Sequence, residues 1–119
     1  SNLTEFLLSE QHSVVGIDDF NDFYTPDIKR RNVAAFAKHS AFRLHEGSIT
    51  DKSLLDTVFA SEKHFDAIIH LAARAGVRPS IQQPFLYNEV NVQATTYLLE
   101  LARLHGVKKF VFGSSSSVY

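Results

Sequence analysis

The stretch Phe65-Asp66-Ala67-Ile68-Ile69-His70-Leu71-Ala72-Ala73-Arg74-Ala75-Gly76 decides the fold that this sequence predicts. A nearly unbroken apolar run that ends in small residues is typical of a strand buried on both faces, and such strands belong to parallel sheets covered by helices. We therefore expect a strand from about Ala67 to Ala72. Its small carboxyl end either leaves room for a flat ligand near the backbone, where open α/β sheets bind ligands, or lets a helix pack closely.

Helical and strand patterns alternate along the rest of the chain. The expected strands cover residues 13–17, 42–46, 67–72 and 110–112. Four helices are expected. The first covers residues 3–8, and the second begins at Pro26 with Thr25 as its N-cap. The third begins after Thr50, which can cap it, and the fourth runs from residue 84 to 105. Residues 77–84, bracketed by two prolines, predict a loop at the ligand edge. This order predicts an α/β fold, a doubly wound parallel sheet with helices on both faces.

Composition excludes several classes of function. The 119 residues suit one domain, and 12 Lys and Arg against 13 Asp and Glu give no basic surface for nucleic acid. There is no cysteine, so disulfides and cysteine metal sites are excluded, and the six histidines lack metal-ligand spacing. No apolar run approaches the ~20 residues of a membrane span. We expect a cytoplasmic protein that binds no metal, nucleic acid or membrane.

Both ends of the sequence look incomplete for such a fold. The chain opens inside a helical pattern and stops after a strand and a serine run at Tyr119. We therefore expect residues 1–119 to form one partial nucleotide-binding domain, with the sheet incomplete at both ends.

Acidic residues close the strand predicted at residues 13–17. A carboxylate at the end of the second strand of a dinucleotide-binding unit accepts hydrogen bonds from both ribose hydroxyls and repels a 2′-phosphate, so Asp18 favours NAD over NADP. Arg30 and Arg31 lie downstream and could fold back onto a phosphate. Alternatively, Asp18 and Asp19 only begin a turn, and the cations of residues 29–31 form a solvated helix face.

Two motifs stand out, His70-Leu71-Ala72-Ala73-Arg74-Ala75-Gly76-Val77-Arg78 and Phe110-Val111-Phe112-Gly113-Ser114-Ser115-Ser116-Ser117-Val118-Tyr119. Both resemble motifs of the extended short-chain dehydrogenase/reductase family of nucleotide-sugar epimerases and dehydratases. Within that family, residues 18–24 followed by Lys29-Arg30, together with residues 74–78, are most similar to UDP-glucuronate 4-epimerases. The resemblance covers essentially the whole chain.

The resemblance implies a role for each matching position. The expected cofactor-binding residues contact the adenosine ribose, flank the adenine, or form the nicotinamide-side edge; they are Asp18 and Asp19, Ser48 and Ile49, and Leu71, Ala72, Ala73 and Arg74. Ser48 stands where the family usually has Asp. Ser115 matches the catalytic Ser/Thr that hydrogen-bonds the sugar 4-oxygen, and Ser116, Ser117 and Arg78 are the expected substrate-binding residues.

The resemblance also implies a reaction. The intact protein is expected to be an NAD-dependent 4-epimerase that interconverts UDP-glucuronate and UDP-galacturonate through a 4-keto intermediate, as a homodimer formed through the helix at residues 84–105. The family's Gly-rich turn and Tyr-x-x-x-Lys pair are absent from these residues, so the fragment alone is expected to be inactive. A 4,6-dehydratase and a non-catalytic dinucleotide-binding scaffold remain the alternatives.

Four polar side chains near the predicted edge have expectations drawn from their own chemistry and surroundings. Arg74 and Arg78 suit a phosphate or uronate oxyanion, but each could pair with Glu89 or face solvent. His70, inside an apolar run, is expected to be a hydrogen-bonded core histidine. Asn91 is expected to hydrogen-bond backbone near the cofactor loop.

Overall fold

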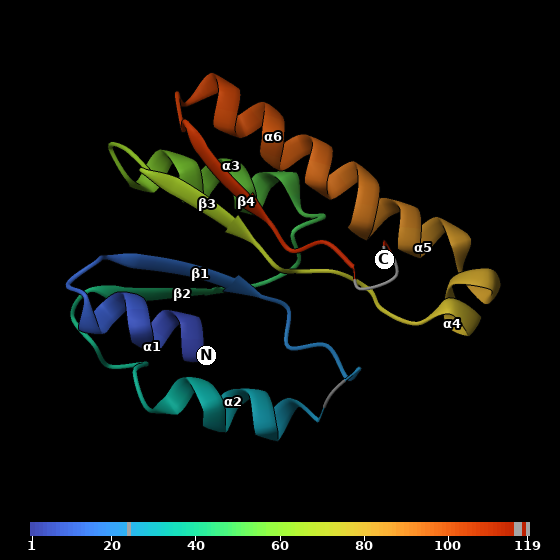
Figure 1. The fold of residues 1–119 in the computed structure, drawn as a ribbon, viewed down its shortest axis with the longest axis horizontal. Coiled ribbons are helices and arrows are strands. Elements are labelled where there is room, and N and C mark those ends of the chain that lie inside the picture. The colour runs from blue at the N-terminus through green and yellow to red at the C-terminus, as the bar shows by residue number, and fades with distance from the viewer. Residues whose placement is uncertain (24, 116–117, 119) are drawn as a thin grey trace. The chain divides into compact units, whose positions relative to one another are not determined.

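The chain divides into two compact units, Ser1–Ser48 and Ile49–Tyr119. The structure is a computed structural model that describes residues 1–23, 25–115 and 118. We call the two parts unit 1 and unit 2 and treat each by itself. Figure 1 shows the order of their helices and strands.

Unit 1 is a two-stranded parallel ladder with two helices. It contains α1 (Asn2–Ser9), β1 (Val14–Asp18), α2 (Pro26–Ala34) and β2 (Phe42–Glu46). The strands pair in register from Val14 opposite Phe42 to Asp18 opposite Glu46. Leu8, Phe36 and Phe42 form its buried core, and the last two rings meet edge to face at 4.9 Å. As predicted, Thr25 is the N-cap and Pro26 the first residue of α2.

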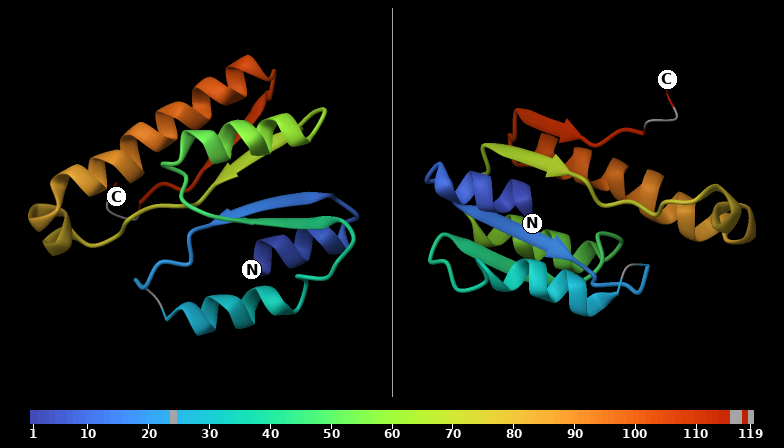
Figure 2. Two further views of the ribbon diagram at one scale, coloured as in Figure 1. Left: turned by 180° about the vertical axis from the view of Figure 1, so that it is seen from behind. Right: turned by 60° about the horizontal axis from the view of Figure 1, so that its bottom comes forward.

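Unit 2 begins with α3 (Lys52–Ser61) and β3 (Ala67–His70). It continues through α4 (Val77–Gln82), α5 (Pro84–Asn88), the π-helical turn η1 (Glu89–Gln93) and α6 (Ala94–Leu104) to β4 (Lys109–Phe112). Strands β3 and β4 are parallel, with Ala67 opposite Lys109 and His70 opposite Phe112, and they lie side by side in both views of Figure 2. The core between α3 and α6 contains Leu55, Val58, Phe59, Leu98, Leu101 and Ala102.

The α/β class and the parallel strands are confirmed. The four strands pair as two separate two-stranded sheets, β1 with β2 and β3 with β4. The helix cap at α3 differs from the prediction, because Asp51 rather than Thr50 is the N-cap. The Asp51 carboxylate accepts a hydrogen bond from the Leu54 N–H at 3.1 Å, which satisfies a donor that the helix itself leaves unpaired.

The expectation that the strand at residues 67–72 is buried on both faces is wrong. The strand is shorter, ending at His70, and only the face that carries His70 is covered: His70 is 4% exposed, whereas Ile69 is 38% and Leu71 62% exposed. Successive side chains of a strand point to opposite faces, and the helix α6 covers the His70 side through Thr95. One face of this apolar strand therefore packs on the core, and the other face is exposed.

The loop expected at residues 77–84 is also not what forms. Residues Val77–Gln82 make the short helix α4, with Pro79 at its third position, and Pro84 begins α5. Both prolines lie in a first helical turn, where the missing N–H has no helical acceptor. Gly76 precedes α4 with φ of +104°, a conformation that L side chains rarely adopt.

The long helix expected at residues 84–105 forms, with one unforeseen feature. In Figure 1 the ribbon from α5 to α6 is one continuous rod, but its middle is the π-helical turn η1. Asn91 in this turn donates from Nδ2 to the Arg74 carbonyl at 2.9 Å, and its Oδ1 accepts the Arg74 N–H at 2.8 Å. The expected contact of Asn91 with nearby backbone is thereby confirmed, and we call it the Asn91 clamp.

His70 is the satisfied core histidine that the sequence predicts. Its Nε2 lies 2.8 Å from Thr95 Oγ1, and that hydroxyl donates its single proton to the Asn91 carbonyl at 2.9 Å. The hydroxyl must therefore accept from His70, which makes Nε2 the protonated nitrogen of a neutral ring. Burial lowers the pKa of His70, in agreement with the neutral form. A chain of hydrogen bonds thus joins β3 through α6 to the Asn91 clamp.

Within the residues that the structure describes, no helix is both long enough and apolar enough to cross a membrane.

We expect Asn91→Ala to lower the free energy of unfolding by about 2 kcal/mol, because it leaves two partly buried peptide groups of Arg74 without partners. Asn91→Asp retains the acceptor but not the donor, so its free energy of unfolding should lie between those of the wild type and Asn91→Ala. Urea unfolding of the purified protein measures both. Asn88→Ala is the matched control, since Asn88 is an exposed residue of the same rod. Equal stability of the Asn91→Ala and Asn88→Ala variants would contradict a stabilising clamp.

Candidate functional site

The carboxyl edge of unit 1 carries a half-exposed carboxylate. Asp18 is the last residue of β1, and its side chain is 46% exposed. Its Oδ1 accepts the Phe20 N–H at 2.8 Å and lies 3.4 Å from the Lys29 ammonium. The carboxylate is therefore held in one orientation while it stays accessible to a ligand.

The turn that follows β1 is built by carboxylates and one amide. Asp19 Oδ1 accepts from the backbone and the side chain of Asn21, and Asn21 Oδ1 accepts the Phe23 N–H at 3.2 Å. Asp18 holds Phe20, which is buried at 7% exposure with φ of +46°, a left-handed conformation uncommon for an aromatic residue. Both acids thus begin a turn, as the simpler interpretation had it, and Asp18 also presents a carboxylate at the edge.

Two cations of α2, Lys29 and Arg30, pair with carboxylates at the strand ends. Lys29 meets Asp18, and Arg30 makes a two-pronged contact with Glu46, the last residue of β2, at 3.2 and 2.7 Å. The hydrogen bonds to Glu46 raise the pKa of Arg30, and the negative charge of Glu46 raises it further. Ser48 and Ile49 follow β2 in the sequence, and Ile49 is buried.

The carboxyl edge of unit 2 is formed by two neighbouring strand ends. The Gly113 N–H donates to the His70 carbonyl at 3.0 Å and so continues the ladder one step past β4. A Cβ at Gly113 would come within 2.9 Å of Leu71 Cδ2, so a larger residue there would require the exposed Leu71 side chain to turn aside. Parallel strands end at the same edge. Leu71, Ala72 and Ala73, which follow β3, and Ser115, which follows β4, are all exposed.

Arg74 and Arg78 differ in how firmly they are placed. Arg74 is partly buried, and both its peptide groups are held by the Asn91 clamp. Arg78 is exposed in the first turn of α4. Among the described residues neither arginine forms a salt bridge, so the expected alternative of pairing with Glu89 is not realised there.

Tyr87, four positions before Asn91, holds the next peptide of the same segment. Its hydroxyl donates to the Ala75 carbonyl at 2.6 Å. Together with the Asn91 clamp, this bond fixes the backbone of residues 74 and 75 from two points on the α5–η1 rod. The backbone at residues 74 and 75 is therefore held by side chains of the rod, although the neighbouring side chains at this edge are small.

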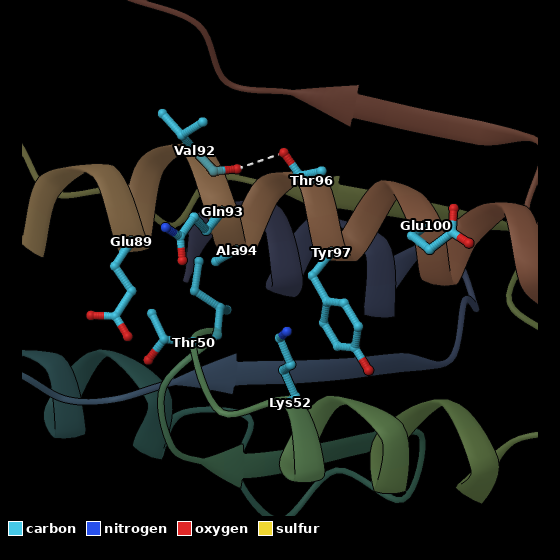
Figure 3. A pocket seen from close by; sticks show the side chains of 10 residues that line it. Thr50, Lys52, Glu89, Val92, Gln93, Ala94, Thr96, Tyr97 and Glu100 are labelled. Atoms are coloured by element: carbon cyan, nitrogen blue, oxygen red, sulfur yellow. Dashed lines mark hydrogen bonds between the residues drawn. The ribbon is translucent and has the colours of Figure 1, made fainter. Parts of the chain in front are cut away.

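A pocket of about 460 Å³ lies in unit 2, where the start of α3 faces η1 and α6. In Figure 3 the Lys52 ammonium points toward the Tyr97 ring, and Glu89 and Glu100 lie at opposite ends of the pocket. Lys52 Nζ is 5.1 Å from the ring centre, and the Tyr97 hydroxyl donates to Asp56 at 2.6 Å. Of the described residues predicted for the site, Ile49 alone lines this pocket.

Sequence reasoning missed three contributors to these edges. Glu46 and Thr95 gave no motif, because an acid at a strand end and a threonine in a helix are common surface residues. Tyr87 could have been suspected only from the amphipathic pattern of its helix. The predicted substrate residues Ser116 and Ser117 lie outside the described residues. In the described part of the chain, no group of three or more His, Asp or Glu side chains is arranged to hold a metal ion.

Comparison with known proteins identifies the family. A match to the sequence model of GDP-mannose 4,6 dehydratase spans residues 1–119. The chain is 42% identical to a UDP-glucuronate 4-epimerase of Thermodesulfobacterium geofontis, over 97% of this chain and 35% of that protein. It is 40% identical to UDP-glucose 4-epimerase 2 of Oryza sativa subsp. japonica, over 97% of this chain and 28% of that protein.

Solved structures agree. The UDP-glucuronic acid 4-epimerase from Bacillus cereus, crystallised in complex with NAD, superposes with a TM-score of 0.82 at 29% identity, covering 99% of this chain and 37% of that one. The chain thus spans about a third of the length of the relatives it matches. With parallel strand ends that carry the predicted motifs, the chain belongs to the GDP-mannose 4,6 dehydratase family of extended short-chain dehydrogenases/reductases.

Proposed function

We propose that the complete protein is an NAD-dependent nucleotide-sugar 4-epimerase that interconverts UDP-glucuronate and UDP-galacturonate. The observation that carries this proposal is the 42% identity to a UDP-glucuronate 4-epimerase over 97% of the chain. The B. cereus UDP-glucuronic acid 4-epimerase in complex with NAD supports the same cofactor.

The residues of unit 1 fit the adenosine end of NAD. A half-exposed carboxylate at a strand end, fixed through one oxygen, can accept hydrogen bonds from a ribose diol. In this proposal Asp18 holds the ribose, and Asp19 holds the turn that positions it. Ser48, the last residue of unit 1, and the next residue in the sequence, Ile49, flank the adenine.

The residues of unit 2 fit the reacting end. Exposed Ala72 and Ala73 leave the backbone open to a flat ring, and the Asn91 clamp fixes the Arg74 backbone beside them. Bound NAD would supply a hydride acceptor and donor at the sugar C4, where a planar ketone allows inversion. Ser115 polarises the 4-oxygen, and Ser116, Ser117 and Arg78 contact the sugar carboxylate.

A 4,6-dehydratase is the second candidate, since the matching family model bears that description. The same fold without chemistry would be a dinucleotide-binding scaffold. One assay separates the three. The complete protein with NAD is offered UDP-glucuronate and GDP-mannose in parallel. UDP-galacturonate formation supports the epimerase, loss of water from GDP-mannose supports the dehydratase, and NAD binding without either product supports the scaffold.

We further propose that the α5–η1–α6 rod contributes to a homodimer. Several of its apolar side chains are exposed, among them Phe85 at 89%, Val92 at 57% and Leu99 at 48%. Exposed apolar surface of this kind, where it is contiguous, often marks an interface between proteins. We expect the complete protein to sediment as a dimer and Val92→Glu to shift it toward the monomer. A wild-type protein that sediments as a monomer at micromolar concentration would refute this proposal.

We expect Asp18→Ala to weaken NAD binding roughly tenfold to a hundredfold, because two charge-assisted hydrogen bonds to the ribose are lost. Titration calorimetry of the complete protein measures the change. Asp22→Ala is the matched control, since Asp22 is an exposed acid of the same loop and should bind NAD normally. Wild-type affinity in the Asp18→Ala variant would remove Asp18 from the ribose site.

We expect Ser115→Ala to lower kcat roughly a hundredfold and to leave NAD affinity unchanged, because the hydroxyl acts on the sugar oxygen and not on the cofactor. Epimerisation of UDP-glucuronate, followed by chromatography of the two uronates, gives the rate. Ser114→Ala, one residue earlier at the same exposed strand end, serves as control. Full turnover in the Ser115→Ala variant would exclude it from catalysis.

A further inference from the structure

The carboxyl edge of unit 1 contains two carboxylates and two cations in close array. Asp18 and Glu46 are register partners at the ends of β1 and β2. Each meets one cation from the same helix, Lys29 for Asp18 and Arg30 for Glu46. Each of these two carboxylates is therefore matched by a cation, although residues 29–31 of α2 alone would present a run of positive charge to an anion.

Arg30 is held at this edge by two different contacts. Its guanidinium meets Glu46 through both terminal nitrogens, at 3.2 and 2.7 Å, the geometry in which Arg binds oxyanions best. It also stacks over the Phe20 ring, with 4.7 Å from Cζ to the ring centre. Phe20 is the buried residue whose N–H is bonded to Asp18. Arg30 therefore lies next to the turn that orients Asp18, and its guanidinium is already hydrogen-bonded to Glu46.

The two forms of the dinucleotide would meet this edge differently. A ribose diol needs hydrogen-bond acceptors, which Asp18 supplies. A 2′-phosphate needs cations. Lys29 and Arg30, the two cations that contact the ends of β1 and β2, are both paired with carboxylates. Binding the phosphate would require Arg30 to leave Glu46, and Glu46 would then repel the phosphate.

We propose that Glu46 is a cofactor-selectivity residue: by pairing with Arg30 it withholds that guanidinium from a 2′-phosphate and so makes the edge of unit 1 discriminate against NADP. The inference rests on the proposed function, because it assumes that the adenosine ribose binds at Asp18. Glu46 acts through Arg30 and does not itself contact the cofactor. Asp18 remains the direct acceptor of the diol.

The test is a binding measurement on the complete protein, independent of turnover. Dissociation constants for NAD and NADP are measured by calorimetry for the wild type, Glu46→Gln and Glu46→Ala. We expect both variants to bind NAD within about twofold of the wild type and to narrow the NADP/NAD ratio of dissociation constants about tenfold, the value of one freed charge-assisted contact. The ratio should narrow without inverting, because the Asp18 carboxylate still faces the phosphate.

Two further variants make the result specific. Adding Arg30→Met to Glu46→Ala should restore the wild-type ratio, since the freed guanidinium is then gone. Glu100→Gln is the matched control, because Glu100 forms a comparable exposed two-pronged pair with Arg103 on α6 and its loss should leave the ratio unchanged. NAD binding with an unaltered ratio in both Glu46 variants would overturn the inference alone. Failure of the wild type to bind NAD would overturn the proposed function and the inference with it.

Discussion

Parallel pairing in register is the constraint on which the rest of the structure depends. In each unit two neighbouring strands run in the same direction, so their carboxyl ends reach the same edge. A parallel pair cannot close with a tight turn; it needs a crossover, and α2 and the α4–α6 segment provide the two crossovers. The chemistry follows from this geometry, because residues distant in sequence, such as Asp18 and Glu46 or Ala73 and Ser115, end up on common edges.

The features that the sequence predicted well are those with strong local causes. Period-two and period-3.6 apolar patterns placed every strand within a few residues, and Pro26 marked the start of its helix because proline suits the first helical position. His70 was read correctly as a core residue, since a lone polar group in an apolar run must find a partner. Asn91 was expected to reach backbone, and it does so through two hydrogen bonds.

What the sequence could not supply depends on neighbours in space. Proline signals turns and first helical turns alike, so residues 77–84 were read as loop where α4 forms. The apolar content of residues 67–72 does not say which face is covered, and Ile69 and Leu71 proved exposed. Likewise, the partner of Arg30 is sixteen positions away, and only the strand register brings Glu46 beside it. A local sequence pattern cannot predict pairs of residues that are brought together only by the fold.

The π-helical turn has a consequence for how related chains align. A π turn places one more residue in a turn than an α-helix does, so everything beyond it is rotated by roughly 100° relative to an uninterrupted helix. The side chains of α6 therefore do not continue the helical phase of α5. Removing one position between Glu89 and Gln93 would restore a single helical phase, and would turn the Asn91 carboxamide away from Arg74. The extra residue in this rod thus interrupts the regular α-helical repeat, and in return it lets Asn91 hydrogen-bond the backbone of Arg74.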